Sequence, residues 1–163
     1  CGADASVELI GGMPAFELQD FSDIIGDAQG CDIPDVAQRG ICVAQLRRVR
    51  KFVESHCIAW GWASTTPHCK GRPLSPESVT SYDLCAYVLR PATRQRRCSF
   101  VELVADTPQP ADWFVSHWWG EPVALFVACL LQHAHDRRLG DAAPYWICAT
   151  ALNHWDLCGG GPG

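Results

Sequence analysis

The stretch from residue 113 to residue 150 constrains the fold most, because its apolar pattern changes character twice. Residues 113–117 form a short apolar run rich in strand-forming side chains. An amphipathic helix then begins at Pro122 and ends near Leu139, and residues 145–150 form a second apolar run. A strand, a helix and a strand within about forty residues predict a βαβ unit, whose strands lie parallel with a right-handed crossover.

The first part of this stretch has roughly the length of a membrane span, since residues 113–132 are mostly apolar. However, Gly120, Glu121 and Pro122 interrupt it, and His117 comes shortly before them. Proline and glycine at this place break a helix. We therefore expect a strand, a turn and a helix here, and no membrane span.

The part of the chain before this unit is expected to be mainly helical. Between residues 34 and 60, apolar residues recur at three- and four-residue spacing, which indicates one face of an amphipathic helix. Further helices are predicted over residues 17–28, from Ser75 to Pro91, and over residues 99–105, where Ser99 and Glu102 match a capping box. The predicted fold class is α/β, with a helical N-terminal region packed on a partial parallel, flavodoxin-like βαβ sheet.

These patterns predict three segments. Residues 1–74 form the mainly helical N-terminal region, residues 75–158 hold the partial βαβ region, and residues 159–163 form a flexible glycine-rich tail. The chain opens on Cys1 without an initiator methionine, so we expect a fragment with processed ends. No basic segment followed by an apolar one opens the chain, which predicts no signal peptide and a cytoplasmic location.

Charge and cysteine content narrow the function classes. The chain has 13 Lys and Arg against 18 Asp and Glu, a formal net charge of −5, which argues against a nucleic-acid partner. The ten cysteines are widely and irregularly spaced, and no CxxC occurs. We expect reduced, buried cysteines that act as small apolar residues, with disulfides in an oxidising compartment as the alternative.

Polar and aromatic residues gather where the two predicted strands end. Ligands of open α/β sheets bind outside the carboxyl ends of the strands, and the helix that begins at Pro122 adds free backbone N–H groups for an anion. In the alternative interpretation, the indoles only cover the sheet edge while the histidines and acids cap it. The candidate ligand- or partner-binding residues are Ser116, His117, Trp118, Trp119, Glu121, Asn153, His154, Trp155 and Asp156.

Other chemistries have weaker signals. A hydrolase triad of Ser116, His117 and Asp156 is disfavoured, because adjacent strand residues point to opposite faces. The basic run at residues 47–51 is interpreted as a solvated helix face, with an anionic partner as the alternative. No metal site is expected, because adjacent residues rarely reach one tetrahedral ion. The weak metal candidates are His56, Cys57, His68 and Cys69.

Residues 113–123, WFVSHWWGEPV, followed by an amphipathic helix and by YWICA at residues 145–149, resemble a TIR-like (Toll/interleukin-1 receptor) domain. Ser116, His117 and Glu121 match the opening of such domains. The chain is more closely similar to uncharacterised protist proteins that share the FVSHWWGEP motif and a block like CSFVELVA at residues 98–105. The likeness covers about residues 79–157, the N-terminal half of a TIR-like domain.

This resemblance implies a flavodoxin-like sheet of about five parallel strands, of which two are expected here. It also implies that the glutamate with which family members cleave NAD lies beyond the matched half, so no residue of this chain inherits that role. One departure is Leu152-Asn153-His154, where the protist proteins have Asn-Asn-Gln. The resemblance therefore favours a protein without catalytic residues of its own.

Three functions follow as hypotheses. The first is a non-catalytic TIR-like interaction or signalling module that binds other proteins, including copies of itself, through an open sheet edge. The second is an NAD- or nucleotide-binding hydrolase that needs a missing C-terminal half, with His117 and Glu121 holding phosphate or ribose. The third is a structural subunit of a larger assembly. No cofactor is expected under the first hypothesis.

Overall fold

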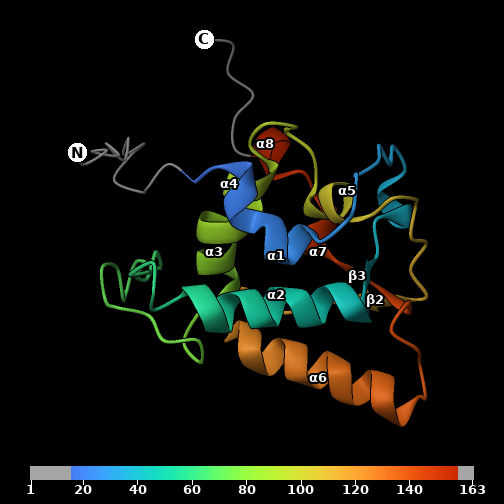
Figure 1. Ribbon diagram of the computed structural model, residues 1–163. Helices are drawn as coiled ribbons and strands as arrows, with labels where there is room; N and C mark the ends of the chain where they lie inside the picture. The colour runs from blue at the N-terminus through green and yellow to red at the C-terminus, as the bar shows by residue number, and fades with distance from the viewer. Residues whose placement is uncertain (1–15, 158–163) are drawn as a thin grey trace.

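The computed structural model describes residues 16–157, so the tail expected at residues 159–163 lies outside the described residues. Helices supply most of the regular structure, and one small sheet lies at the side of the molecule (Figure 1). In chain order the elements are η1 (Leu18–Phe21), α1 (Ser22–Ile25), η2 (Val36–Gln38), β1 (Ile41–Cys42), α2 (Val43–His56), α3 (Ser81–Leu84), η3 (Cys85–Leu89), α4 (Arg90–Thr93), α5 (Phe100–Val104), β2 (Trp113–Val115), α6 (Val123–Asp136), β3 (Pro144–Ile147), α7 (Cys148–Ala151) and α8 (His154–Leu157).

The sheet has three strands in the order β1-β3-β2. Strands β2 and β3 pair in parallel, with Phe114 opposite Trp146, and α6 connects them. The predicted parallel βαβ unit is therefore confirmed. Strand β1 pairs with β3 antiparallel, with Ile41 opposite Tyr145, so the sheet is mixed and not purely parallel.

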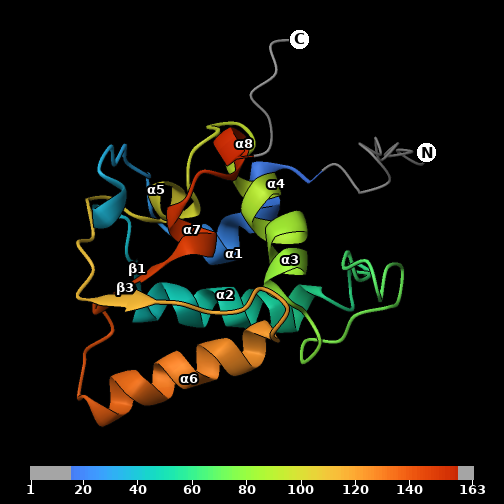
Figure 2. The same ribbon diagram turned by 180° about the vertical axis from the view of Figure 1, so that it is seen from behind.

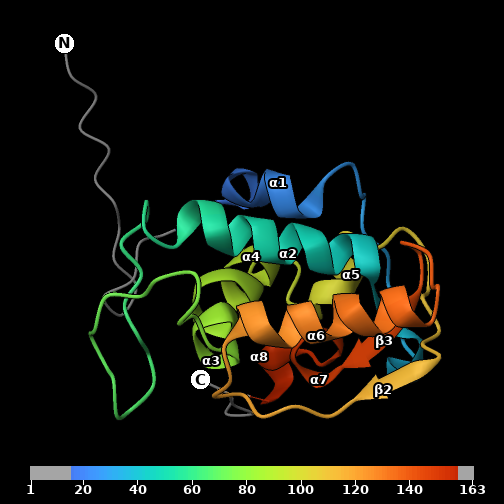
Figure 3. The ribbon, with the colours of Figure 1, turned by 90° about the horizontal axis from the view of Figure 1, so that it is seen from below.

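One face of the sheet is covered by two long helices. Helices α2 and α6 run side by side, and α1 packs on the other side of α2 (Figures 1 and 3). Ile147 of β3 is buried on this side, against apolar residues of α2 and α6. Seen from behind, α5 and α7 lie beyond β3, and the loop of residues 57–80 protrudes at the far end of α2 (Figure 2). The C-terminal ends of β2 and β3, where the candidate site residues follow, are thus supported by the layer of α2 and α6.

Two predicted elements have different ends in the structure. The apolar run at residues 145–150 is a strand only as far as Ile147, and Cys148–Ala151 form helix α7. The helix predicted to start at Ser75 starts at Ser81, because Thr80 and Asp83 form a reciprocal capping box there. It also continues past Leu89, since the wider π-helical turn η3 leads into α4, which contains Pro91 in its first turn.

The N-terminal helices are shorter than predicted. The pattern between residues 34 and 60 contains η2, β1 and α2, and only Val43–His56 form the long helix. Gly40 lies so close to Gln109 that a Cβ atom would be 2.6 Å from the Gln109 carbonyl oxygen, and the Gly40 N–H donates a hydrogen bond to that oxygen at 2.9 Å. The helix predicted over residues 17–28 is a 3₁₀ turn followed by α1, and Gly26 ends it with φ +66°.

The cysteines are free thiols in the part of the chain that the structure describes. Cys42 and Cys57 are buried as expected, and burial, with the nearby carboxylates of Asp83 and Glu77, raises the pKa of Cys57 to about 11. The expectation of burial is wrong for Cys129, which is exposed on α6, and it holds only in part for the half-buried Cys31, Cys69, Cys85, Cys98 and Cys148. Between residues 16 and 157, no helix combines the length and the apolar character that crossing a bilayer requires.

Candidate functional site

The strand ends bring three of the predicted site residues into one row of rings. The centroid of the Trp119 ring lies 6.4 Å from that of His117 and 5.6 Å from that of His154. Trp119 also donates a hydrogen bond from Nε1 to Cys148 Sγ at 3.4 Å. The predicted meeting of residues 117–119 with residue 154 is therefore present in the structure.

His117 is half-buried, and its two ring nitrogens differ. Its Nε2 lies 3.4 Å from the hydroxyl of Ser81, whereas its Nδ1 is buried without a hydrogen-bond partner. Its ring stacks on Phe126 with the centroids 4.5 Å apart. Burial lowers the pKa of His117, and the carboxylate of Glu121 opposes this shift only in part. The imidazole is therefore neutral at pH 7.

His154 has a structural environment. Its side chain is 7% exposed, and Nε2 donates a hydrogen bond to the carbonyl of Ala149 at 2.7 Å. This bond joins the start of α8 to α7. The Nε2 of His154 is thus engaged in holding α8 to α7, beside the Trp119 ring.

The other predicted site residues of this region, Asn153, Trp155 and Asp156, lie near residues 90–97. Trp155 lies between two guanidinium groups, 4.9 Å from Arg90 and 5.1 Å from Arg97, and its Nε1 donates to the hydroxyl of Thr93. Asn153 donates from Nδ2 to the Arg97 carbonyl and to the Asp156 carboxylate. These contacts attach the segment that contains α8 to α4 and to Arg97, which follows α4.

Two aromatic side chains, Phe114 in β2 and Trp118 shortly after it, are largely exposed. The Phe114 side chain is 74% exposed and stacks on Trp146 at 4.8 Å. Trp118 is 73% exposed, and its indole lies over Gly120, where a Cβ atom would come within 2.3 Å of the ring. Ser116 is exposed as well, whereas Glu121 is half-buried. Phe114 and Trp146 were not among the predicted site residues, although strand alternation places them on one face.

The weak metal candidates do not converge. Cys57 is fully buried and donates from Sγ to the Leu74 carbonyl, while His56 stacks on Phe52. His68 is exposed and Cys69 is half-buried, both in the protruding loop. Residues 16–157 contain no group of three or more His, Cys, Asp or Glu side chains that could hold a metal ion.

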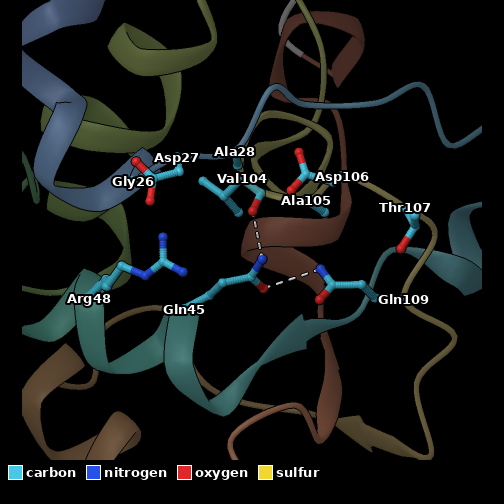
Figure 4. A pocket seen from close by; sticks show the side chains of 10 residues that line it. All are labelled: Gly26, Asp27, Ala28, Gln45, Arg48, Val104, Ala105, Asp106, Thr107 and Gln109. Atoms are coloured by element: carbon cyan, nitrogen blue, oxygen red, sulfur yellow. Dashed lines mark hydrogen bonds between the residues drawn. The ribbon is translucent and has the colours of Figure 1, made fainter.

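A hollow of about 500 Å³ lies elsewhere, between α1, α2 and α5 (Figure 4). Its floor is Gln45, which donates to the Val104 carbonyl and accepts from Gln109. Three separate chain segments contribute to it, so no motif in the sequence marks it. The polar side chains that line it are Asp27, Gln45, Arg48, Asp106, Thr107 and Gln109.

The comparisons with known proteins add no relative. No family model, no curated protein and no solved structure matches the chain. Two features of the molecule are candidates for function: the exposed aromatic residues in and after β2, and the hollow beside Arg48.

Proposed function

We propose that this chain is a non-catalytic, TIR-like protein-interaction module that binds through the β2 edge and the aromatic outer face of its sheet. The observation that carries the proposal is the exposure of Phe114 and Trp118, which are 74% and 73% accessible. Large aromatic side chains are enriched at protein interfaces, where their burial contributes most of the binding free energy. The resemblance of residues 113–123 to TIR-like domains agrees with this role.

The edge of the sheet supplies the backbone part of the contact. Strand β2 lies at one end of the order β1-β3-β2, and among the described residues it pairs only with β3. Its outer N–H and C=O groups are therefore available to a further strand, which is the mode of recognition known as β-augmentation.

The partner that fits this edge is a second copy of the chain. An antiparallel pairing of two β2 strands about a two-fold axis at Phe114 places Trp113 of one copy opposite Val115 of the other. The two Phe114 rings then extend the existing Phe114–Trp146 stack across the interface. No like charges oppose each other within β2, because the strand contains only Trp, Phe and Val.

Light scattering after size exclusion tests this proposal. We expect a concentration-dependent dimer, and we expect Phe114→Asp to weaken it by at least about tenfold, because the carboxylate would be buried at the two-fold axis. Leu125→Asp is the matched control, since Leu125 is also exposed, at 63%, but lies on α6. A monomer at all concentrations, or an equal loss in both variants, would contradict the proposal.

The NAD- or nucleotide-hydrolysing alternative has less support in the geometry. The Nε2 of His117 contacts the hydroxyl of Ser81, which is only 2% exposed, so this nitrogen faces a buried side chain. One face of the His117 ring is covered by the ring of Phe126, which stacks on it. Incubation of the chain with NAD, followed by measurement of nicotinamide release, separates the two hypotheses: turnover would favour the hydrolase.

A further inference from the structure

Two hollows meet at Arg48, on the side of α2 that faces α1. The larger, of about 500 Å³, extends toward α5, and the smaller, of about 190 Å³, follows α2 toward its C-terminal end. Arg48 lines both. Figure 4 shows its guanidinium group at the rim of the larger hollow, beside Gly26 and Asp27. A volume of several hundred cubic ångströms is in the range of small-molecule sites.

The backbone around Gly26 is shaped to hold this guanidinium group. Gly26 ends α1 at φ +66°, and a Cβ atom there would come within 2.4 Å of Arg48 Nη1. The same Nη1 donates to the Ile25 carbonyl at 3.0 Å. Among residues 16–157, no carboxylate lies within the 4.0 Å ion-pair distance of Arg48. A half-buried cation is thus held in place by a backbone carbonyl, with carboxylates in the same hollows but none in direct ion-pair contact.

The two hollows offer different chemistry. The smaller one presents hydrogen-bond donors from Arg48, Lys51 and Ser55, with Asp23 as its one acid. A phosphate group suits such a donor set. The larger hollow presents acceptors from the carboxylates of Asp27 and Asp106 and hydroxyl and amide groups from other residues, and these suit several hydroxyl groups.

We propose that the paired hollows bind a phosphorylated polyol of the sugar-phosphate class. The phosphate lies against Arg48 and Lys51 in the smaller hollow, and the hydroxylated carbon chain occupies the larger one against Asp27 and Gln109. This site is distant in sequence from β2 and independent of the proposed self-association. Its lining comes from α1, α2, the end of α5 and the loops that follow α1 and α5, and it includes no residue of β2.

Isothermal titration calorimetry on the full chain tests the proposal with three probes: glucose 6-phosphate, glucose and inorganic phosphate. We expect glucose 6-phosphate to bind at least about tenfold more tightly than either of the other two, because it alone has both a phosphate for the smaller hollow and hydroxyl groups for the larger one. No heat with glucose 6-phosphate up to about 10 mM would overturn the proposal. Equal affinity for inorganic phosphate would also overturn it, because the larger hollow would then contribute nothing.

Variants locate the binding. Lys51→Ala removes an exposed side chain of the smaller hollow and is expected to weaken glucose 6-phosphate by about fivefold or more without unfolding the chain. Arg47→Ala is the matched control on the same helix, because Arg47 pairs with Asp141 outside both hollows. An unchanged affinity in Lys51→Ala, or an equal loss in Arg47→Ala, would contradict the assignment. Thermal unfolding of each variant confirms that the comparison is between folded chains.

Discussion

Glu102 and His117 are two polar side chains that enter the interior in opposite ways. The Glu102 carboxylate accepts hydrogen bonds from the Ile33 and Ser99 backbone N–H groups and forms an ion pair with Arg39 at 3.2 Å. His117 instead has one long contact, to Ser81, and one nitrogen without a partner. The first region satisfies its polar atoms through groups far apart in the sequence, whereas the second leaves one unsatisfied.

The difference shows in how each group titrates. Burial alone would raise the pKa of Glu102, but the hydrogen bonds from Ile33 and Ser99 and the nearby Arg39 charge lower it below its usual value. Burial lowers the pKa of His117 with little opposition. Glu102 is therefore ionised within a network of hydrogen bonds and an ion pair that joins the N-terminal loop to α5. The neutral His117, in contrast, keeps one ring nitrogen without a hydrogen-bond partner. The first contributes stability, and the second lies next to the proposed interaction surface.

The largest expected effect is on the Glu102 network. Glu102→Gln leaves the Arg39 guanidinium buried without its counter-charge, and we expect it to reduce the free energy of unfolding by about 3–5 kcal/mol. Urea denaturation at pH 7 measures the loss. The matched control is Glu54→Gln, whose exposed ion pair with Arg50 contributes about 0.3–0.5 kcal/mol.

A loss below about 1 kcal/mol in Glu102→Gln would show that the Glu102 network contributes no more to stability than an exposed ion pair does. The pH dependence gives a second check. Because the folded pKa of Glu102 is lowered, its contribution is full above the unfolded pKa near 4.5 and is lost as the pH falls through the folded value.

The next effect concerns His117 and has the pH dependence of a group whose pKa is lowered. The unfolded chain binds the proton more tightly than the folded chain, so His117 destabilises the fold as the pH falls below about 6.5. We expect His117→Leu to reduce the slope of unfolding free energy against pH between pH 6.5 and 5, by at most about 1.4 kcal/mol per pH unit. Urea denaturation across this range measures it, and an unchanged slope would contradict the environment described for His117.

The smallest effect is expected from Ser81→Ala. The hydroxyl of Ser81 lies 3.4 Å from His117 Nε2, too far for a strong hydrogen bond, so its loss is expected to change the unfolding free energy by less than about 1 kcal/mol. The pH slope is expected to stay as in the parent chain. A loss above about 2 kcal/mol would mean that the pair is a firm bond and that the two regions are more alike than described.

The sequence predicted the βαβ unit because its signals are local. The apolar run before Pro122, the helical period of α6 and the second run at β3 each extend over enough residues to be recognised. Strand β1 has only two residues and is formed by pairing with β3, so no local pattern marks it. Helix α7 was predicted as strand because a short apolar run is compatible with either structure until tertiary contacts decide.

The candidate site was predicted only in part. His117, Trp119 and His154 do meet, because they follow the two strands whose pairing the sequence indicated. The contact of His117 with Ser81 was missed, and its one signal was the capping pattern of Thr80 and Asp83, which places Ser81 at the start of α3. The hollow beside Arg48 had no signal, since only the folded chain brings its segments together.

The pairing of β1 with β3 also has a consequence for synthesis. Ile41 and Cys42 are synthesised about a hundred residues before their partners Pro144 and Tyr145. The carbonyl of Val36 likewise precedes its hydrogen-bond donor, the indole of Trp146, by about a hundred residues. Until then, the apolar start of α2 has no sheet to cover. We therefore expect a nascent chain stopped before β3 to hold exposed apolar surface and to need a chaperone, and its release from one to follow the emergence of Ile147.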